Sequence, residues 1–156
     1  LAKSVNRTGI GGATIRSLYI TSNSGHRTKS LGIGEPLTVN IEIEFAFDFP
    51  KIVIGLEIKN SMGIQILNLR SDSQSYYFGP YKRGDVGLFK IAIPGLALYP
   101  GEYLLEPWLC ELKGKRIDQI HDAFKLTLES QKNLECENFI QNGRGIMLLD
   151  CSWNSE

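Results

Sequence analysis

The 156-residue sequence predicts an all-β protein, an antiparallel β-sandwich of about eight strands. Short segments with alternating apolar and polar residues recur along the chain, and a period of two is typical of strands half-buried against a core. Turns rich in glycine and proline separate these segments at regular intervals, as they do in sandwiches. No segment has the spacing of a convincing amphipathic helix, so the pattern favours two packed sheets.

The individual strands follow from this alternation and from the turns that bound them. The segment 36–45 is the clearest, because its odd-numbered residues are apolar from Leu37 onwards and its even-numbered ones are polar. A short turn at 60–63 leads into the segment 64–69 and predicts a hairpin. In chain order, the predicted strands cover residues 13–20, 36–45, 52–59, 64–69, 86–93, 101–112, 116–119, 121–128 and 146–153.

Tyr103 refines the fold class. It begins the segment 101–112, directly after a turn that contains Pro100 and Gly101. Immunoglobulin-like sandwiches often place a tyrosine at such a corner, where its hydroxyl bonds to the backbone upstream. We therefore predict an immunoglobulin-like sandwich, with an ordinary core tyrosine as the alternative reading of Tyr103.

Two segments fall outside the strand pattern. Residues 1–12 are polar and glycine-rich, and we expect them to be a linker before a sandwich domain that covers 13–156. Residues 129–145 form a polar stretch that is long for a loop in a compact domain. As a linker it would let the last strand, 146–153, pair with a second copy of the chain in a swapped homodimer. An ordinary long surface loop is the alternative.

Composition limits the partners. The chain carries 17 basic and 17 acidic residues, so its net charge is zero, whereas duplex DNA and anionic membranes normally bind proteins with a basic excess. We therefore expect no nucleic-acid partner. No apolar run approaches the roughly 18–20 residues that span a bilayer, so we expect no membrane insertion. Three widely spaced cysteines and two histidines suit a reducing compartment and offer little for a zinc site, so we expect no cofactor and no metal.

Signatures of catalysis are absent or incomplete. Residues 9–12 hint at a phosphate-binding loop, but Thr14 stands where the dinucleotide fingerprint needs glycine, and a strand follows instead of a helix. Glycosidases need two carboxylates across a cleft, which the sequence does not place. We therefore predict no enzyme. A glycan-active enzyme that uses Glu106 with Glu57 or Glu102 is the weakest alternative.

The segment 101–112 carries the most informative aromatic residue. Its odd-numbered residues are predicted to face the core, which leaves Glu106 and Trp108 on the opposite face. Sugar rings present apolar C–H faces that stack on an indole, while carboxylate, amide and cationic groups bond the hydroxyls. We therefore predict that Trp108 and Glu106 belong to a carbohydrate-binding face. The alternative is that Trp108 covers a second apolar cluster or lies in a dimer contact.

Four further residues join this face by the same alternation. Glu57 and Lys59 point away from the core in the segment 52–59, as do His121 and Lys125 in the segment 121–128. If these strands are neighbours of 101–112, they form one polar, partly cationic surface with the tryptophan.

The loop 76–83 is a second candidate, because four aromatic residues and two cations follow one another there. Such a loop could line a glycan or single-stranded nucleic-acid groove, and zero net charge makes nucleic acid the weaker ligand. Tyr81 is therefore included among the candidate carbohydrate-binding residues. The alternative is that Tyr77 and Phe78 begin a strand and pack inward.

The order of these segments gives a resemblance over nearly the whole chain. The sequence resembles the C-terminal carbohydrate-binding domain of the ATP-binding subunit in ABC transporters that export bacterial O-antigen polysaccharides, the Wzt type. No single motif is very specific, but the ordered set is moderately so. The segments that carry it are GIGGATIRSLYI at 9–20, LGIGEPL at 31–37, IGLEIKNSMGIQI at 54–66, FKIAIPGLALYPGEY at 89–103, AFKL at 123–126 and the segment 146–153, which ends in tryptophan.

The resemblance implies a function. The domain would recognise the modified non-reducing end of a lipid-linked O-antigen, without catalysis, and would dimerise by exchanging its last strand. Residues 1–12 would be the linker from an N-terminal ATPase domain. The partners would be the ATPase and permease subunits, on the cytoplasmic side of the inner membrane. A protein-interaction or assembly module that binds no sugar is the alternative.

Overall fold

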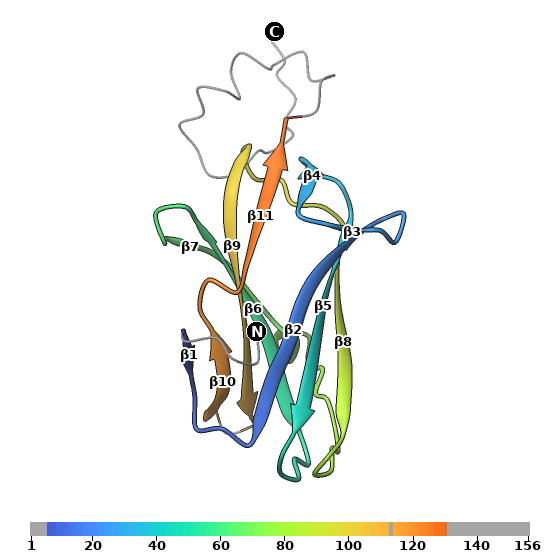
Figure 1. Cartoon of the computed structure of the whole chain (residues 1–156), viewed down its shortest axis with the longest axis vertical. Helices are drawn as coiled ribbons and strands as arrows, with labels where there is room; N and C mark the ends of the chain where they lie inside the picture. Colours follow the sequence, from blue (N-terminus) through green and yellow to red (C-terminus); the bar gives the residue numbers. More distant parts are fainter. Residues whose placement is uncertain (1–5, 113, 131–156) are drawn as a thin grey trace, which may run out of the picture.

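The computed structural model describes residues 6–112 and 114–130, which form two β-sheets packed face to face (Figure 1). Within these residues the only helical element is a single turn of 3-10 helix, η1. This confirms the predicted all-β sandwich. The elements are β1 Arg7–Thr8, β2 Ala13–Ser22, β3 Arg27–Thr28, β4 Ser30–Gly32, β5 Leu37–Phe45, β6 Ile52–Asn60, β7 Gln65–Arg70, η1 Ser71–Gln74, β8 Val86–Ile93, β9 Gly101–Glu111, β10 Arg116–Ile120 and β11 Phe124–Glu129.

Strand β9 is the centre of the larger sheet, which has seven strands. β6 pairs along one of its edges and carries β7 beyond it, while β10 and β11 share the other edge. The smaller sheet has four strands in the order β3-β2-β5-β8. β7 and β8 are therefore outermost strands of their sheets. All but one of the paired strands are antiparallel, the exception being β4 with β11.

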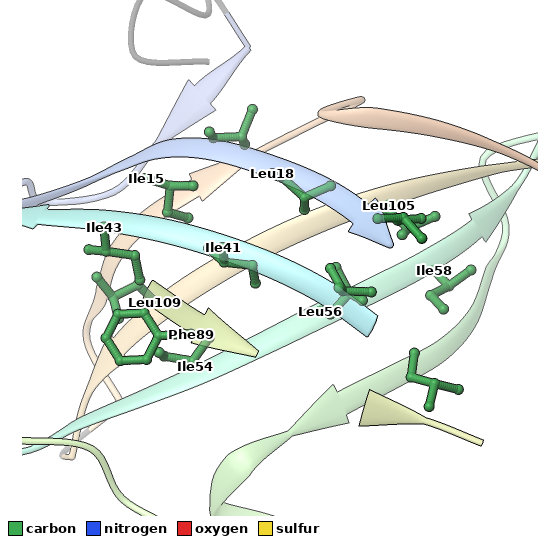
Figure 2. Packing of buried hydrophobic residues seen from close by; sticks show 14 of the residues in the cluster. Ile15, Leu18, Ile41, Ile43, Ile54, Leu56, Ile58, Phe89, Leu105 and Leu109 are labelled. Atoms are coloured by element: carbon green, nitrogen blue, oxygen red, sulfur yellow. The ribbon is translucent and has the colours of Figure 1, made fainter. Parts of the chain in front are cut away.

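The core lies between the two sheets and is built by the predicted alternation. Figure 2 shows Ile15, Ile41 and Ile43 of the smaller sheet against residues of the larger one, such as Leu56 and Leu105, and all five are fully buried. β-branched side chains fit a pleated surface well, so isoleucine dominates this interface. Tyr103 belongs to the same core, and its hydroxyl donates to the Tyr99 carbonyl at 2.7 Å. This bond confirms the predicted tyrosine corner.

The N-terminal segment corrects the expected linker. Arg7–Thr8 pair with β10, so these two residues of the segment 1–12 are part of the larger sheet. The Arg7 guanidinium binds the buried Asp118 carboxylate, which also accepts the Ile15 amide hydrogen at 2.7 Å. A two-residue strand has too few positions to show a period. The contacts that hold it join residues more than a hundred positions apart.

Two other expectations can be placed against the described residues. The linker 129–145 and the terminal strand 146–153 lie almost entirely outside them. Within residues 6–112 and 114–130, no helix is long and apolar enough to cross a membrane.

Candidate functional site

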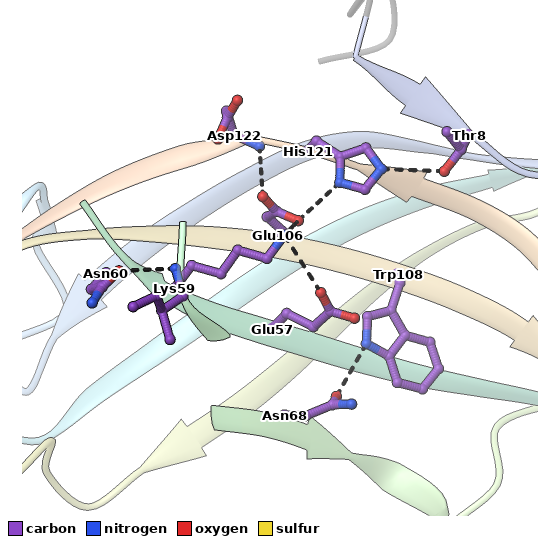
Figure 3. Close-up of polar contacts among 10 residues, drawn as sticks. Thr8, Glu57, Lys59, Asn60, Asn68, Glu106, Trp108, His121 and Asp122 are labelled. Atoms are coloured by element: carbon purple, nitrogen blue, oxygen red, sulfur yellow. Dashed lines mark hydrogen bonds and ion pairs between the residues drawn. The ribbon is translucent and has the colours of Figure 1, made fainter. Parts of the chain in front are cut away.

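The predicted neighbourhood of strands on the outer face of the larger sheet is correct. Because β9 lies between β6 and β10, its Glu106 pairs with Glu57 across the sheet and lies beside Lys59 and His121 (Figure 3). We call these four residues the outer-face cluster. Alternation along β6 and β9 brings the first three together, and His121 follows directly after β10.

Glu106 is the centre of the outer-face cluster and is only 2% exposed. Its Oε2 accepts a hydrogen bond from Lys59 Nζ at 2.7 Å and lies 2.9 Å from His121 Nδ1, while its Oε1 accepts the Asp122 amide hydrogen at 3.3 Å. Burial alone would raise the pKa of this carboxyl, but the three hydrogen bonds outweigh it and the pKa lies below its usual range. Glu106 is therefore an ionised carboxylate with protein partners at both oxygens.

The rest of the cluster is engaged in the same way. Lys59 Nζ also lies 3.9 Å from Glu57 Oε2, so one ammonium bridges two carboxylates. His121 Nε2 lies 3.4 Å from the Thr8 hydroxyl of β1. A general acid in a glycosidase needs a carboxyl whose pKa is raised, which is the opposite of the shift at Glu106. The geometry therefore gives the enzyme alternative no support at this cluster.

Trp108 points to the predicted face, but the prediction that it is exposed there is wrong, because it is 1% exposed. Its ring lies over Gly55, where a Cβ atom would overlap the indole. Its Nε1 donates to Asn68 Oδ1 of β7 at 3.3 Å, and the Arg116 and Arg70 guanidinium carbons lie 4.3 and 5.2 Å from its ring centre. Trp108 thus forms a second apolar cluster with Val53 and Cys110, which was the alternative interpretation of this residue from the sequence.

The two remaining predicted site residues, Lys125 and Tyr81, lie in different places. Lys125 lies on the outer face, where its Nζ is 3.1 Å from Glu102 Oε2 and both side chains are more than half exposed. Tyr81, predicted as a binding residue of the loop 76–83, is partly buried and packs toward the core. Its ring stacks on Phe45 at 4.3 Å and packs against the main core, so burial raises the pKa of its hydroxyl.

A cavity of about 720 Å³ lies between β7 and β8, the outermost strands of the two sheets. We call it the edge cavity. Part of its lining is apolar and packs on the core, and the rest is polar and comes from β7, η1, the residues after η1 and Lys90 of β8. Among the described residues, no acidic residue lines it. The apolar lining includes Ile54, Leu67, Leu69, Phe78, Phe89 and Ile91, and the polar lining includes Asn68, Arg70, Ser71, Ser73, Gln74, Tyr76 and Lys90.

Tyr76 is the exposed aromatic residue of the edge cavity, with 60% of its surface accessible. Its backbone amide donates to the Ser71 carbonyl at 3.0 Å, which fixes it next to η1. Its ring meets Phe78 edge-on at 4.9 Å, and Phe78 in turn meets Phe89 edge-on at 4.9 Å. An aromatic ladder thus leads from the core to the surface, and its outer ring is available for stacking.

The polar groups of the edge cavity differ in their partners. Arg70 makes two hydrogen bonds to Asp72, at 2.8 and 2.9 Å, and these bonds hold the pKa of the Asp72 carboxyl below its usual range. By contrast, the Gln74 amide and the Lys90 ammonium have no protein partner among residues 6–112 and 114–130. Sequence reasoning missed both residues. The signal that pointed here was the aromatic loop 76–83, through Tyr76.

Comparison with known proteins agrees with this architecture. A family model described as the Wzt C-terminal domain matches residues 4–140. A crystal structure of the C-terminal domain of Wzt is similar with a TM-score of 0.81 and 25% identity, over 96% of this chain and 87% of that one. A Niemann-Pick type C2 protein from Japanese carpenter ant shares the fold, with a TM-score of 0.52 and 12% identity over 78% of this chain and 98% of that one. The curated proteins contain no match.

Proposed function

The chain belongs to the Wzt C-terminal domain family, and on that premise we propose that it recognises the modified non-reducing end of an O-antigen polysaccharide for export. The family is non-catalytic and places the chain in the context of an ABC transporter. We propose that the domain works on the cytoplasmic side of the inner membrane, beside the ATPase and permease subunits. Its role there would be to bind the glycan that the transporter accepts.

The edge cavity is the observation that supports this proposal. Its volume of about 720 Å³ lies within the roughly 300–1,000 Å³ of small-ligand sites. The exposed Tyr76 ring offers a surface on which the C–H face of a sugar can stack. The unpartnered Gln74 amide can bond sugar hydroxyls without breaking a protein contact. These are the two kinds of group that recognition of a neutral sugar requires.

The charge of the edge cavity favours an anionic cap on the glycan. Among the described residues, the charged side chains that line it are those of Arg70 and Lys90, so a phosphate or an acidic sugar would meet cationic groups there. Arg70 already binds Asp72, which leaves Lys90 as the more available cation. The outer face of the larger sheet enters this proposal only through Trp108, which bonds Asn68 and contacts Arg70, two residues of β7 that line the edge cavity.

A titration of the protein with purified O-polysaccharides tests the proposal. Each polysaccharide would be presented with its non-reducing end intact or trimmed, and binding measured by calorimetry. We expect one intact polysaccharide to bind and its trimmed form to fail. Uniform failure across the panel would contradict glycan recognition and favour the protein-interaction alternative.

Tyr76→Ala locates the binding site. The substitution removes the exposed ring and should weaken glycan binding about tenfold, because it leaves the sugar no surface for stacking. Tyr77→Ala is the matched control, since Tyr77 is the next residue, is 41% exposed and does not line the edge cavity. Equal binding by both variants would show that the glycan binds elsewhere.

We also propose that the chain is a homodimer that exchanges the strand 146–153. The proposal comes from the length of the polar segment 129–145 that precedes this strand and from the family resemblance. Light scattering on the full chain and on a form that ends at residue 145 tests it. We expect a dimer for the full chain and a monomer for the shortened one. A dimer in both cases would contradict strand exchange.

A further inference from the structure

A second, smaller cavity adjoins the edge cavity at the end of β8. Its volume is about 260 Å³. The two cavities share three lining residues, Ala92, Ile93 and Pro94, so only the end of one strand separates them. The remaining lining residues come from the turn after β2 and the start of β5. They are Asn23, Pro36, Leu37 and Thr38.

The segment between the two cavities is held firmly by the chain opposite it. The Gly34 amide donates to the Leu96 carbonyl at 3.1 Å. Gly95 packs so closely on the Gly34 backbone that a Cβ atom there would overlap it. Pro94 also has a fixed φ angle. These contacts fix the ridge at Pro94, the last residue that lines both cavities, so the two cavities keep a constant separation, as adjacent subsites for one ligand require.

The polar groups of the second cavity are available for a ligand. Asn23 is exposed and its side-chain amide has no partner among the described residues, and the same holds for the Thr38 hydroxyl. By contrast, the amide of nearby Asn40 has protein partners, because Asn40 is 4% exposed and its amide nitrogen contacts three oxygens at 3.2–3.4 Å. An amide and a hydroxyl without protein partners beside apolar walls suit the hydroxyls and C–H face of a sugar.

We propose that the second cavity is a subsite for the next sugar residue of the glycan that binds in the edge cavity. This inference rests on the proposed function. The glycan would cross the ridge at Pro94, with one sugar on Tyr76 and a following sugar against Asn23 and Thr38. The volume of the second cavity is below that of a typical independent site, so it suits one sugar as part of a longer ligand. The domain would then read a short sequence of sugars as well as the cap.

A length series of glycan fragments tests this proposal. The probes are fragments of one to six sugars with the non-reducing end retained, prepared from the O-polysaccharide that binds the unmodified protein. We expect affinity to rise with the sugar that reaches the second cavity. In the double variant Asn23→Ala and Thr38→Val this rise should disappear, a loss of about five- to tenfold for the longer fragments, while the shortest fragment binds unchanged.

A matched double variant, Asn6→Ala with Thr14→Val, controls for the loss of any surface amide and hydroxyl. Neither residue lines a cavity described here, so affinity should keep its full dependence on fragment length. If the Asn23 and Thr38 variant also keeps it, the second cavity is no subsite, although glycan recognition stands. If no fragment and no polysaccharide binds the unmodified protein, the proposed function and this inference both fail.

Discussion

The outer-face cluster and the edge cavity contain similar kinds of residue, but the polar groups of the cluster are bonded to other protein groups, whereas several of those in the cavity are not. The outer-face cluster lies beside Trp108 and the edge cavity contains Tyr76, each together with charged and polar groups, and Asn68 and Arg70 of strand β7 contact Trp108 and also line the edge cavity. In the outer-face cluster the Glu106 carboxylate has protein partners at both oxygens, and the neighbouring Trp108 is covered. In the edge cavity, Tyr76 is exposed and Gln74 and Lys90 have no partner among the described residues.

This difference separates a structural cluster from a ligand site on physical grounds. A ligand must replace the hydrogen bonds that a polar group already makes, and breaking buried ones costs the full desolvation of the groups left behind. The Lys59 and His121 contacts of Glu106 would have to be broken in that way. Groups without protein partners exchange only water for the ligand. The comparison predicts that substitutions in the outer-face cluster affect stability and that those in the edge cavity affect binding.

The largest expected effect on stability is that of Trp108→Ala. The indole is 1% exposed and packs on Gly55, so its removal leaves a cavity and should lower the free energy of unfolding by about 3–5 kcal/mol. Urea denaturation followed by far-ultraviolet circular dichroism measures this. Tyr76→Ala is the comparison, and should change stability by less than about 1 kcal/mol because its ring is exposed. Equal stabilities for the two variants would contradict the burial of Trp108.

Glu106→Gln should have the next largest effect, a loss of about 1–3 kcal/mol at pH 7, because it removes the charge that Lys59 and His121 contact. The pKa of Glu106 is lower in the folded chain than in the unfolded one, so its contribution is fully present above the unfolded value of about 4.3. That contribution is lost as the pH falls through the folded pKa. The difference between variant and unmodified protein should therefore shrink below about pH 4. A constant difference would show that the charge of Glu106 is not responsible.

The sequence was sufficient for the longer strands and for the side of the sheet on which a residue lies, but it did not predict the short strands β1, β3 and β4. Alternation depends only on neighbours along the chain, so it placed Glu57, Lys59, Glu106 and Trp108 on one face correctly. It could not reveal whether anything covers that face. Trp108 is buried by Asn68, Arg70 and Arg116, which reach it from β7 and β10 through pairings distant in sequence.

The edge cavity was beyond sequence reasoning for the same reason. Its lining runs from Ile54 to Leu96 and exists only because β7 and β8 end their sheets side by side without pairing. The exposed Tyr76 and the inward-packing Tyr81 belong to one loop and cannot be told apart by residue type. Strand β1 was missed because two residues show no period. The Arg7–Asp118 pair that holds it is a tertiary contact.

Lys125→Met should have the smallest effect on stability. It allows a comparison of two lysines, Lys125 and Lys59, that differ in exposure. Lys125 and Lys59 both bind a glutamate of β9 on the outer face, at 3.1 and 2.7 Å. Lys125 and its partner Glu102 are 59% and 55% exposed, so water and salt screen the pair and its loss should cost about 0–1 kcal/mol. The Lys59 side chain is 21% exposed and that of its partner Glu106 is 3% exposed, so Lys59→Met leaves a buried carboxylate short of a cation and should cost more. Denaturation of both variants at low and high salt measures the contrast, and only the Lys125 pair should weaken clearly with salt. Equal costs for the two lysines would show that the outer-face cluster is as accessible to solvent as the rest of the sheet. The cluster would then again be a candidate glycan-binding site.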